Sequence, residues 1–394
     1  MKTAIINAKL VLPYRVVEGG LLLEGGKIAA VLGNEVPEAE QIIDAKGRYV
    51  SPGFIDIHTH GGGGHDYMDG TVEAFTGAAR AHMQHGTTAL LPTPLTCSDE
   101  ELFNVFEVFR QVKEMDWEGP ELLGLHLEGP YLAYEQRGAQ DPRYLKEPKP
   151  EHYMRVLDAC PDIRRITIAP ELDGAMELGC ELKKRGIQAS IGHTCATYEQ
   201  VIDACENGFS MLTHFYSAMS TIVRINAFRH LGVIESAYMI DDLNVEIIAD
   251  GKHLPPELLK FILKFKSWDR ICLVTDSMRG AGMPEGSIVK LGSLKDGQDS
   301  IIDNGVAFMM DHSGFAGSIC TTDRCVRTMV KLAGIPLEDA VRMITVNPAR
   351  YLGVDDRMGA LRAGMDADIC IFDDDVQIKG VLVKGKLAVD HLND

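Results

Sequence analysis

The middle of the sequence, residues 51–352, alternates short apolar runs with amphipathic stretches, and this alternation constrains the fold more than any other feature. Runs that are apolar at nearly every position are typical of strands buried on both faces of a parallel sheet, whose connections are helices. Eight strands separated by helices predict an α/β protein with a (β/α)8 barrel. The predicted strands are Phe54–Ile57, Ala89–Leu91, Leu122–Leu125, Ile166–Ile168, Gln188–Ile191, Met211–Leu212, Val245–Ile248 and Ile271–Val274.

The stretches between these strands place apolar residues three and four positions apart, which gives each predicted helix one face to bury. The clearest examples are Glu100–Lys113, Ala175–Arg185, Tyr198–Asn207 and Pro256–Phe265. Two later helices, Thr322–Leu332 and Leu337–Thr345, complete the predicted outer layer.

Both ends of the chain predict short strands and tight turns instead of helices. Near the N-terminus, Gly25-Gly26 separates two apolar runs, which is a signal for a two-residue hairpin turn. Near the C-terminus a similar turn is predicted at Gly385-Lys386. We therefore expect residues 1–50 and 353–394 to form one small discontinuous β-sandwich domain beside the barrel of residues 51–352. The strands predicted in it include Leu21–Glu24, Lys27–Val31, Asp368–Phe372, Gly380–Val383 and Leu387–Asp390.

Charge and composition exclude several classes of protein. The formal net charge of −18 argues against a nucleic-acid partner, because phosphate backbones bind proteins through lysine and arginine patches. The sequence has neither a signal peptide nor an apolar run near the ~18–20 residues of a membrane-spanning helix. Its nine cysteines include no CxxC pair, as expected of reduced thiols. We expect a cytoplasmic protein that acts on a small molecule, without a membrane partner.

Histidines and carboxylates follow the predicted strands at the points where the strands end. Barrel enzymes carry their active sites on this face, where the carboxyl ends of all eight strands meet. Residues two apart on a strand point to the same side, so His58 and His60 can both face the barrel mouth. The candidate site residues are His58 and His60 after the first strand, Glu128 after the third, His193 after the fifth, His214 after the sixth, His253 after the seventh and Asp276 after the eighth.

Imidazole nitrogen and carboxylate oxygen are ligands that suit Zn²⁺ or Fe²⁺. Taken singly, His193 or His214 is more often a hydrogen-bonded structural histidine than a metal ligand, and Glu128 or Asp276 alone could cap a loop or a helix. Together these groups are hard to explain structurally, because burying so many without partners would be costly. The sequence therefore predicts one or two divalent ions, bound by side chains on this rim.

Several motifs in order along the chain resemble one family. They are PGFIDIHTHG at Pro52–Gly61, LEGP at Leu127–Pro130, RGAQDP at Arg137–Pro142, GHT at Gly192–Thr194, TH at Thr213–His214, IADGKH at Ile248–His253, VTDS at Val274–Ser277 and FAGS at Phe315–Ser318. Their order and intervals resemble the N-acetylglucosamine-6-phosphate deacetylase family of the amidohydrolase superfamily over nearly the whole chain.

The resemblance implies a role for each matching residue. Glu128, His193 and His214 match the family's main metal site, and the pair His58 and His60 is typical of members with a second ion. Asp276 matches the catalytic acid and base, beside or within the metal site. The family resemblance also implies a homodimer and cleavage of an N-acetyl group from an amino sugar. The matching substrate contacts are Ala139, Gln140, Ser217, Ala218, His253, Phe315, Ala316 and Gly317.

The segment that matches the family's phosphate-binding loop departs from the family pattern. Ser217 stands where the family has asparagine, and Thr221–Gly232 lacks the usual Arg-Glu-Pro-Gly sequence, whose arginine reaches the phosphate across the dimer interface. Arg224 and Arg229 are candidate substitutes in this loop, and Arg279 is a further one. The alternatives are a deacylase of an unphosphorylated or different N-acyl amino sugar, a hydrolase of cyclic amides or N-acyl amino acids, and a non-catalytic sugar-binding barrel.

Overall fold

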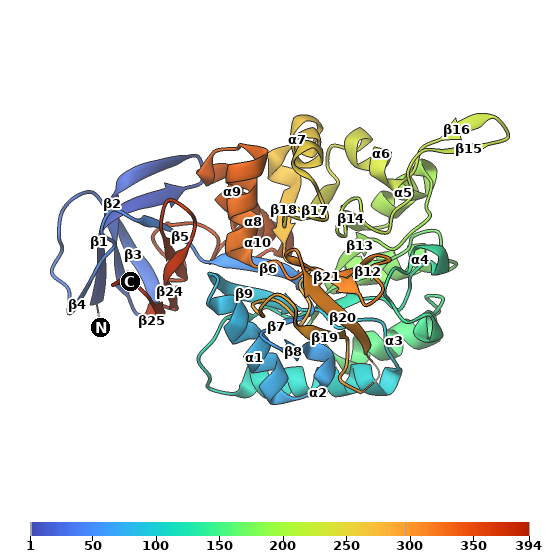
Figure 1. Ribbon diagram of the computed structural model, residues 1–394, viewed down its shortest axis with the longest axis horizontal. Coiled ribbons are helices and arrows are strands. Elements are labelled where there is room, and N and C mark those ends of the chain that lie inside the picture. The colour runs from blue at the N-terminus through green and yellow to red at the C-terminus, as the bar shows by residue number, and fades with distance from the viewer. Residues whose placement is uncertain (1, 296, 394) are drawn as a thin grey trace.

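The computed structural model describes residues 2–295 and 297–393 of the 394-residue chain. The outermost residues of the predicted β-domain, 1 and 394, therefore lie outside the described residues. Figure 1 shows a larger α/β part and, to its left, a smaller β part in which both ends of the chain meet. The chain therefore has a mixed α/β fold, with the two ends brought together as the sequence predicts.

The strands of the two main sheets of the α/β part are parallel, and all but the third lie where the sequence predicts them. They form a three-stranded sheet in the order β10-β9-β6 and a six-stranded sheet in the order β11-β12-β13-β14-β17-β18. The strands are β6 (Phe54–Thr59), β9 (Thr87–Pro92), β10 (Glu121–Leu122), β11 (Leu125–Glu128), β12 (Ile163–Ile168), β13 (Gln188–Ile191), β14 (Phe209–Leu212), β17 (Asn244–Ile248) and β18 (Ile271–Val274).

The predicted third strand, Leu122–Leu125, is instead two short strands that belong to different sheets. β10 pairs with β9, whereas β11 pairs with β12 and continues to Glu128. Gly124 lies between them with φ +142, and a Cβ there would lie 2.5 Å from the carbonyl oxygen of Asp162. The chain changes partner at this residue because only glycine allows the close approach.

The ends of β6 and β18 are joined by backbone hydrogen bonds. The amide of Asp276 donates to the carbonyl of His58 at 2.9 Å, and the amide of His60 donates to the carbonyl of Ser277 at 2.8 Å. A parallel bridge pairs Thr59 with Ser277. The last strand of the six-stranded sheet therefore lies against the first strand of the α/β part, and this contact brings the two histidines of β6 next to Asp276.

The predicted helices are confirmed to within two residues at each end, except one. The helix predicted at Thr322–Leu332 ends at Thr328 and continues as a π-helical segment, Met329–Ala333. No helix among the described residues is long and apolar enough to cross a membrane. The helices are α1 (Val72–Met83), α2 (Asp99–Glu114), α3 (Pro150–Ala159), α4 (Ala175–Arg185), α5 (Tyr198–Glu206), α6 (Val233–Met239), α7 (Pro256–Phe265), α8 (Thr322–Thr328), α9 (Leu337–Ile344) and α10 (Val346–Leu352).

Both chain ends contribute to one eight-stranded sheet in the order β25-β24-β23-β5-β1-β2-β3, with β4 beside β1. The turn between β2 and β3 is Gly25-Gly26, as predicted, and both glycines have positive φ. The last turn is Lys384-Gly385, one residue earlier than predicted, because Lys386 already pairs with Val383. The strands are β1 (Lys2–Leu12), β2 (Arg15–Glu24), β3 (Lys27–Leu32), β4 (Gln41–Asp44), β5 (Tyr49–Pro52), β23 (Ile369–Phe372), β24 (Ile378–Val383) and β25 (Lys386–Asp390).

Three small sheets are separate from the parallel sheets of the α/β part. The hairpin of β15 (Val223–Ile225) and β16 (Phe228–His230) projects away from the body at the upper right of Figure 1. A four-stranded sheet, which follows β18 in the chain, crosses in front of the α/β part. Its strands are β19 (Ile288–Leu291), β20 (Gln298–Asp303), β21 (Val306–Met309) and β22 (Phe315–Gly317). A separate short hairpin follows β6 in the chain, where β7 (Gly61–Gly62) pairs with β8 (His65–Asp66).

Phe372 links the two parts of the molecule. It is fully buried in β23, and the centroid of its ring lies 5.7 Å from that of Tyr49 in β5 and 6.2 Å from that of Phe54 in β6.

We expect Phe372→Ala to lower the free energy of unfolding by about 3–5 kcal/mol, because it leaves a cavity between packed rings. Urea unfolding measures this. Val36→Ala is the control, because this side chain is 60% exposed in the same part of the molecule and its loss should change stability by less than about 0.5 kcal/mol. Equal effects of the two substitutions would contradict the role of Phe372.

Candidate metal and substrate site

Six of the predicted site residues converge at the carboxyl ends of the parallel strands. Each lies at the end of its strand or within two residues of it, so the strand geometry carries the side chains to one point. Glu128 lies at the centre and all four histidines are buried around it. Asp276 is the most open of the six, with 15% of its side chain exposed. The six residues are His58, His60, Glu128, His193, His214 and Asp276.

Glu128, His193 and His214 form a compact triad. The Oε1 atom of Glu128 lies 3.1 Å from Nε2 of His193 and 3.0 Å from Nε2 of His214. The two Nε2 atoms are themselves 3.0 Å apart. Three potential ligand atoms thus face one another at separations that leave room for a single ion among them.

His58 and His60 face Glu128 from the opposite side. Nε2 of His58 lies 3.5 Å from Oε1 of Glu128, and Nε2 of His60 lies 3.4 Å from Oε2. Oδ1 of Asp276 is 3.3 Å from the first of these nitrogens and 3.0 Å from the second. Glu128 therefore belongs to two ligand groups and can bridge them.

The Nδ1 atoms of the four histidines determine which nitrogen faces the centre. Nδ1 of His60, His193 and His214 each donates to a backbone carbonyl oxygen, at 2.8, 2.8 and 3.2 Å. Nδ1 of His58 donates to Oε1 of Glu246 at 2.6 Å. A neutral imidazole has one N–H, so in the neutral form that binds a metal ion all four rings would present an Nε2 lone pair to Glu128.

This donor set fits a divalent metal ion. Lone pairs on four nitrogens would repel a carboxylate, whereas a cation among them would attract every group. Nε2 of His58 is buried and has no hydrogen-bond partner among the described residues, so it needs one of another kind. Nitrogen and carboxylate oxygen are ligands for zinc and for iron.

The charges of these groups depend strongly on one another. Burial alone would raise the pKa of Glu128, but the surrounding histidines hold it well below its usual range. Burial also opposes the shift at Asp276, where His58 and His60 lower the pKa to about 2. Burial would lower the pKa of His60 and His214, but the neighbouring carboxylates raise both values to about 9. The pocket therefore stabilises positive charge beside its two carboxylates, as a cation site must.

Three of the residues have backbone conformations that are uncommon for residues with a side chain. His193, His214 and Asp276 have φ values of +48, +32 and +45. Each left-handed residue costs on the order of 1–3 kcal/mol, and such residues cluster at functional sites. The three strands thus end in the same kind of sharp turn, which aims each side chain across the mouth.

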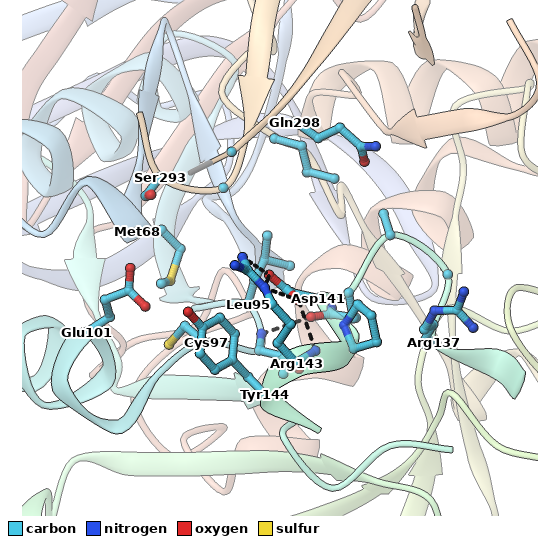
Figure 2. A pocket seen from close by; sticks show the side chains of 18 residues that line it. Met68, Leu95, Cys97, Glu101, Arg137, Asp141, Arg143, Tyr144, Ser293 and Gln298 are labelled. Atoms are coloured by element: carbon cyan, nitrogen blue, oxygen red, sulfur yellow. Dashed lines mark hydrogen bonds and ion pairs between the residues drawn. The ribbon is translucent and has the colours of Figure 1, made fainter. Parts of the chain in front are cut away.

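Gln140 connects the metal cluster to a cavity of about 450 Å³. Its Nε2 donates to Oε2 of Glu128 at 2.6 Å, and its Oε1 accepts from the amide of Thr96 at 2.8 Å. Figure 2 shows Asp141, Arg143 and Tyr144 on one side of this cavity, with Ser293 and Gln298 of the β19–β20 region on the other. Ala139 and Gln140, both predicted substrate contacts, line it.

His253 lies in the loop after β17, five residues beyond its end, and a residue that sequence reasoning did not single out orients it. Oδ2 of Asp250 accepts from Nδ1 of His253 at 2.8 Å, while Oδ1 accepts the amides of Lys252 and His253. The ring of Phe315 packs against His253 at 4.9 Å between centroids. The carboxylate leaves Nε2 of His253 available to a ligand. The Asp-x-x-His spacing was the available signal.

The structure does not bring the candidate phosphate-binding arginines to the cluster of their own chain. Arg224 and Arg229 face each other across the β15–β16 hairpin, and both are exposed. Arg279 is buried and engaged, because it donates to both carboxylate oxygens of Asp69 at 2.8 and 3.0 Å. It is therefore not free to bind a phosphate. Ser217 and Ala218 follow His214 after two intervening residues, and the carbonyl of Ser217 accepts from Nδ1 of His214 beside the cluster.

Two buried charged residues beneath the cluster were missed by the sequence analysis. Glu246 in β17 and Arg165 in β12 form an ion pair of 2.5 Å between Oε2 and Nη1. Burial would raise the pKa of Glu246, but Arg165 and His58 lower it to about 2. A single glutamate in the apolar strand Asn244–Ile248 was the only signal for this pair.

Comparison with known proteins agrees with this geometry. A family model described as the amidohydrolase family matches residues 49–388. The chain belongs to the amidohydrolase family. N-acetylglucosamine-6-phosphate deacetylase of Haemophilus influenzae is 31% identical, over 98% of this chain and 99% of that protein. N-acetylgalactosamine-6-phosphate deacetylase of Escherichia coli O157:H7 is 28% identical, over 93% of this chain and 94% of that protein.

A solved structure shows the same similarity in three dimensions. N-acetyl-D-glucosamine-6-phosphate deacetylase from Mycobacterium smegmatis, in complex with N-acetyl-D-glucosamine-6-phosphate, is similar with a TM-score of 0.89 and 32% identity. The match covers 98% of this amidohydrolase chain and 99% of the other. The resemblance predicted from the sequence motifs is thus confirmed.

Metal binding to the amidohydrolase site can be measured without a substrate. We expect excess Zn²⁺ to raise the melting temperature of chelator-treated protein, because an ion at 100 times its Kd stabilises the native state by about 2.7 kcal/mol. His193→Ala should reduce this rise, because it removes one ligand of the triad. His391→Ala is the control, since this exposed histidine lies beyond β25 in the other part of the molecule. Equal zinc-induced shifts in wild type and His193→Ala would contradict the assignment.

Proposed function

We propose that this amidohydrolase is a metal-dependent deacetylase that converts N-acetylglucosamine-6-phosphate to glucosamine-6-phosphate and acetate. The observation that carries the proposal is the convergence of four Nε2 atoms on Glu128, with Asp276 at its open side. The relative from Haemophilus influenzae has this name and matches the chain over nearly its whole length. The similar Mycobacterium smegmatis structure holds this sugar phosphate. The chemistry of the site and the names of the relatives thus agree.

The proposed metal ligands are Glu128, His193 and His214 for one ion, with His58, His60 and Asp276 available for a second. Either zinc or iron suits these ligands. Such an ion, when bound, polarises the amide carbonyl and promotes the attack of water. The remaining chemistry belongs to side chains of this chain.

Asp276 is the proposed general base and acid. Its Oδ1 atom lies 3.0 Å from Nε2 of His60, on the most exposed side of the cluster. A water molecule that enters the cluster from this side would meet the Asp276 carboxylate. This carboxylate accepts the proton of the water and returns it to the amide nitrogen, because an amine leaves far more readily than its anion. The low pKa of Asp276 keeps its carboxylate ionised at neutral pH, so the oxygen that would accept the proton starts without one.

Hydrogen-bond donors around the cluster position the substrate in this proposal. His253, oriented by Asp250, presents Nε2 to the sugar, and Gln140 lies on the side of Glu128 that adjoins the cavity. Donors aimed at the amide oxygen stabilise negative charge that develops there. Ala139, Ser217, Ala218 and the segment Phe315, Ala316 and Gly317 are proposed to complete the sugar site.

The 6-phosphate is proposed to bind Arg224 and Arg229 of a second subunit. In Figure 1 the hairpin that carries them projects outward from its own chain. It also exposes Ile222, Val223, Ile225 and Phe228, with relative exposures between 45% and 74%. An apolar projecting hairpin is typical of a surface that another chain covers. A homodimer would bury these side chains and carry two guanidinium groups toward the neighbouring site.

We also propose the finer architecture that supports this site. The two parallel sheets are proposed to close into a (β/α)8 barrel of residues 51–352. Backbone hydrogen bonds between β6 and β18 support one seam, and those from Leu123 to Leu90 and from Glu128 to Pro94 support the other. The eight-stranded sheet is proposed to fold over into a β-sandwich domain of residues 1–50 and 353–394. The bond from the amide of Ile28 to the carbonyl of Met365 supports it, because it brings β3, at one end of the sheet order, against the segment that precedes β23, a strand inside the order.

A cytoplasmic location is also proposed. The nine cysteines are scattered along the sequence without a CxxC pair, as is usual for proteins of reducing compartments.

A second substrate is favoured by one specific observation. The relative from Escherichia coli O157:H7 is named for N-acetylgalactosamine-6-phosphate, and the phosphate-loop segment of this chain departs from the pattern of the glucosamine enzymes. An epimer, or an unphosphorylated N-acyl amino sugar, would retain the amide chemistry and change only the contacts at the rim.

The reaction is tested by acetate release from N-acetylglucosamine-6-phosphate, its galacto epimer and unphosphorylated N-acetylglucosamine. We expect kcat/KM to be highest for the first, and Asp276→Asn to lower kcat by about 10²–10⁴-fold through loss of proton transfer. Glu24→Gln is the control, because this exposed carboxylate lies on the end sheet. Faster turnover of the galacto epimer or of the free sugar would reassign the substrate. Absence of acetate from every sugar with zinc or iron present would refute the deacetylase proposal.

The arginine proposal is tested by the double substitution Arg224→Ala and Arg229→Ala. We expect KM for the phosphorylated sugar to rise about 10²–10⁴-fold, because each of the two lost charged hydrogen bonds costs about 1.5–3 kcal/mol, whereas KM for the free sugar should stay the same. Arg15→Ala with Arg110→Ala is the matched control on other exposed surfaces. Light scattering measures whether the wild type is a dimer. A monomer, or equal KM changes for both sugars, would overturn the proposal.

A further inference from the structure

Arg165 and Glu246 form an ion pair in the interior of the parallel sheet, and both side chains have 0% exposure. A buried ion pair contributes little net stability relative to apolar side chains of the same size, because both charges lose their hydration. Packing therefore gives no reason for charged groups in the middle of β12 and β17. The hydrogen bonds of Arg165 and Glu246 indicate what these charges do.

Glu246 touches both halves of the metal cluster from below. Its Oε1 atom accepts from Nδ1 of His58 at 2.6 Å and from the backbone amide of His214 at 2.8 Å. His58 belongs to the group with His60, and His214 belongs to the group with His193. One carboxylate oxygen thus ties a residue of each group to the same atom.

His58 differs from the other three histidines in its Nδ1 partner. Backbone carbonyls accept from the others, whereas a carboxylate accepts from His58. A charged acceptor holds the ring in one tautomer more firmly and makes the opposite nitrogen a stronger ligand. That opposite nitrogen, Nε2, is the buried atom without a hydrogen-bond partner.

Arg165 in turn holds Glu246. Besides the ion pair through Nη1, its Nε donates to Oγ of Ser190 at 2.8 Å and its Nη2 to Oγ1 of Thr213 at 3.1 Å. These hydroxyls come from β13 and from the residue after β14. The guanidinium is therefore fixed by neighbouring strands, and it keeps the carboxylate both charged and aimed at His58.

We propose that Glu246, held by Arg165, is a positioning residue that makes His58 a metal ligand through Nε2 and ties its placement to that of His214. The inference rests on the metal centre of the proposed function but not on the identity of its substrate. Removing the buried pair should weaken metal binding even though neither residue belongs to the ligand cluster.

The test is the double variant Arg165→Met with Glu246→Gln. Removing both charges leaves no unpaired buried ion, and the glutamine Oε1 atom can still accept from Nδ1 of His58, so the comparison isolates the charge. Zinc per folded chain is counted by mass spectrometry after gel filtration, and zinc affinity is measured by chelator competition. We expect the number of tightly held zinc ions to fall, or the affinity of the weaker site to drop about 10–100-fold.

A second variant covers the case in which the double variant does not fold. Glu246→Asp retains the charge opposite Arg165 but withdraws the carboxylate by one methylene, so it cannot reach Arg165 and His58 together. It should lower zinc affinity in the same direction. The matched control is Arg357→Met with Glu121→Gln. This ion pair of 2.7 Å involves the first residue of β10, at the opposite end of the parallel strands from the cluster, so its removal should leave zinc binding unchanged.

The outcomes separate this inference from the substrate assignment. Wild-type zinc number and affinity in folded Glu246 variants would overturn the positioning role, and so would equal zinc loss in the control pair. Acetate release by the wild type is measured in parallel on N-acetylglucosamine-6-phosphate. If zinc binding depends on Glu246 but the wild type releases no acetate, the proposed substrate is refuted and the inference stands.

Discussion

The arrangement of the site depends on one buried carboxylate, Glu128, and on the positive charge needed to hold the four imidazole nitrogens that face it at 3.0–3.5 Å. These groups come from the ends of four different strands, so none can move without disturbing its strand. The other nitrogen of each ring, Nδ1, donates a hydrogen bond to an oxygen atom, which holds the ring in place. These hydrogen bonds fix the orientation of each ring, as a preorganised ligand cluster requires.

This requirement explains features of the fold that packing alone does not. Sharp left-handed turns at His193, His214 and Asp276 aim side chains across the mouth, at a cost in backbone energy. An ion pair lies buried among apolar strands, with its carboxylate against His58. The apolar contacts of the helices and the end sheet supply the stability that these features consume.

The sequence predicted much of this architecture because the determining signals are local. Apolar runs marked the parallel strands, and periodicity and end signals marked helices such as Ala175–Arg185 and Pro256–Phe265 at their observed bounds. The third strand was misplaced because its interruption at Gly124 results from contact with Asp162, which lies far along the chain. Similarly, the π-helical end of α8 at Met329–Ala333 leaves no clear mark in periodicity.

The sequence by itself determined which residues could be ligands, since histidines and carboxylates at strand ends must gather where parallel strands end. Only the tertiary structure decided how they are used. It oriented each imidazole through an acceptor on another segment, such as Thr93 or Gln136, and it paired Glu246 with Arg165 and His58 across three strands. It also committed Arg279 to Asp69 and placed Arg224 on a projecting hairpin. The physical reason is that hydrogen bonds and ion pairs act over about 3 Å in space, whereas the sequence records only order along the chain.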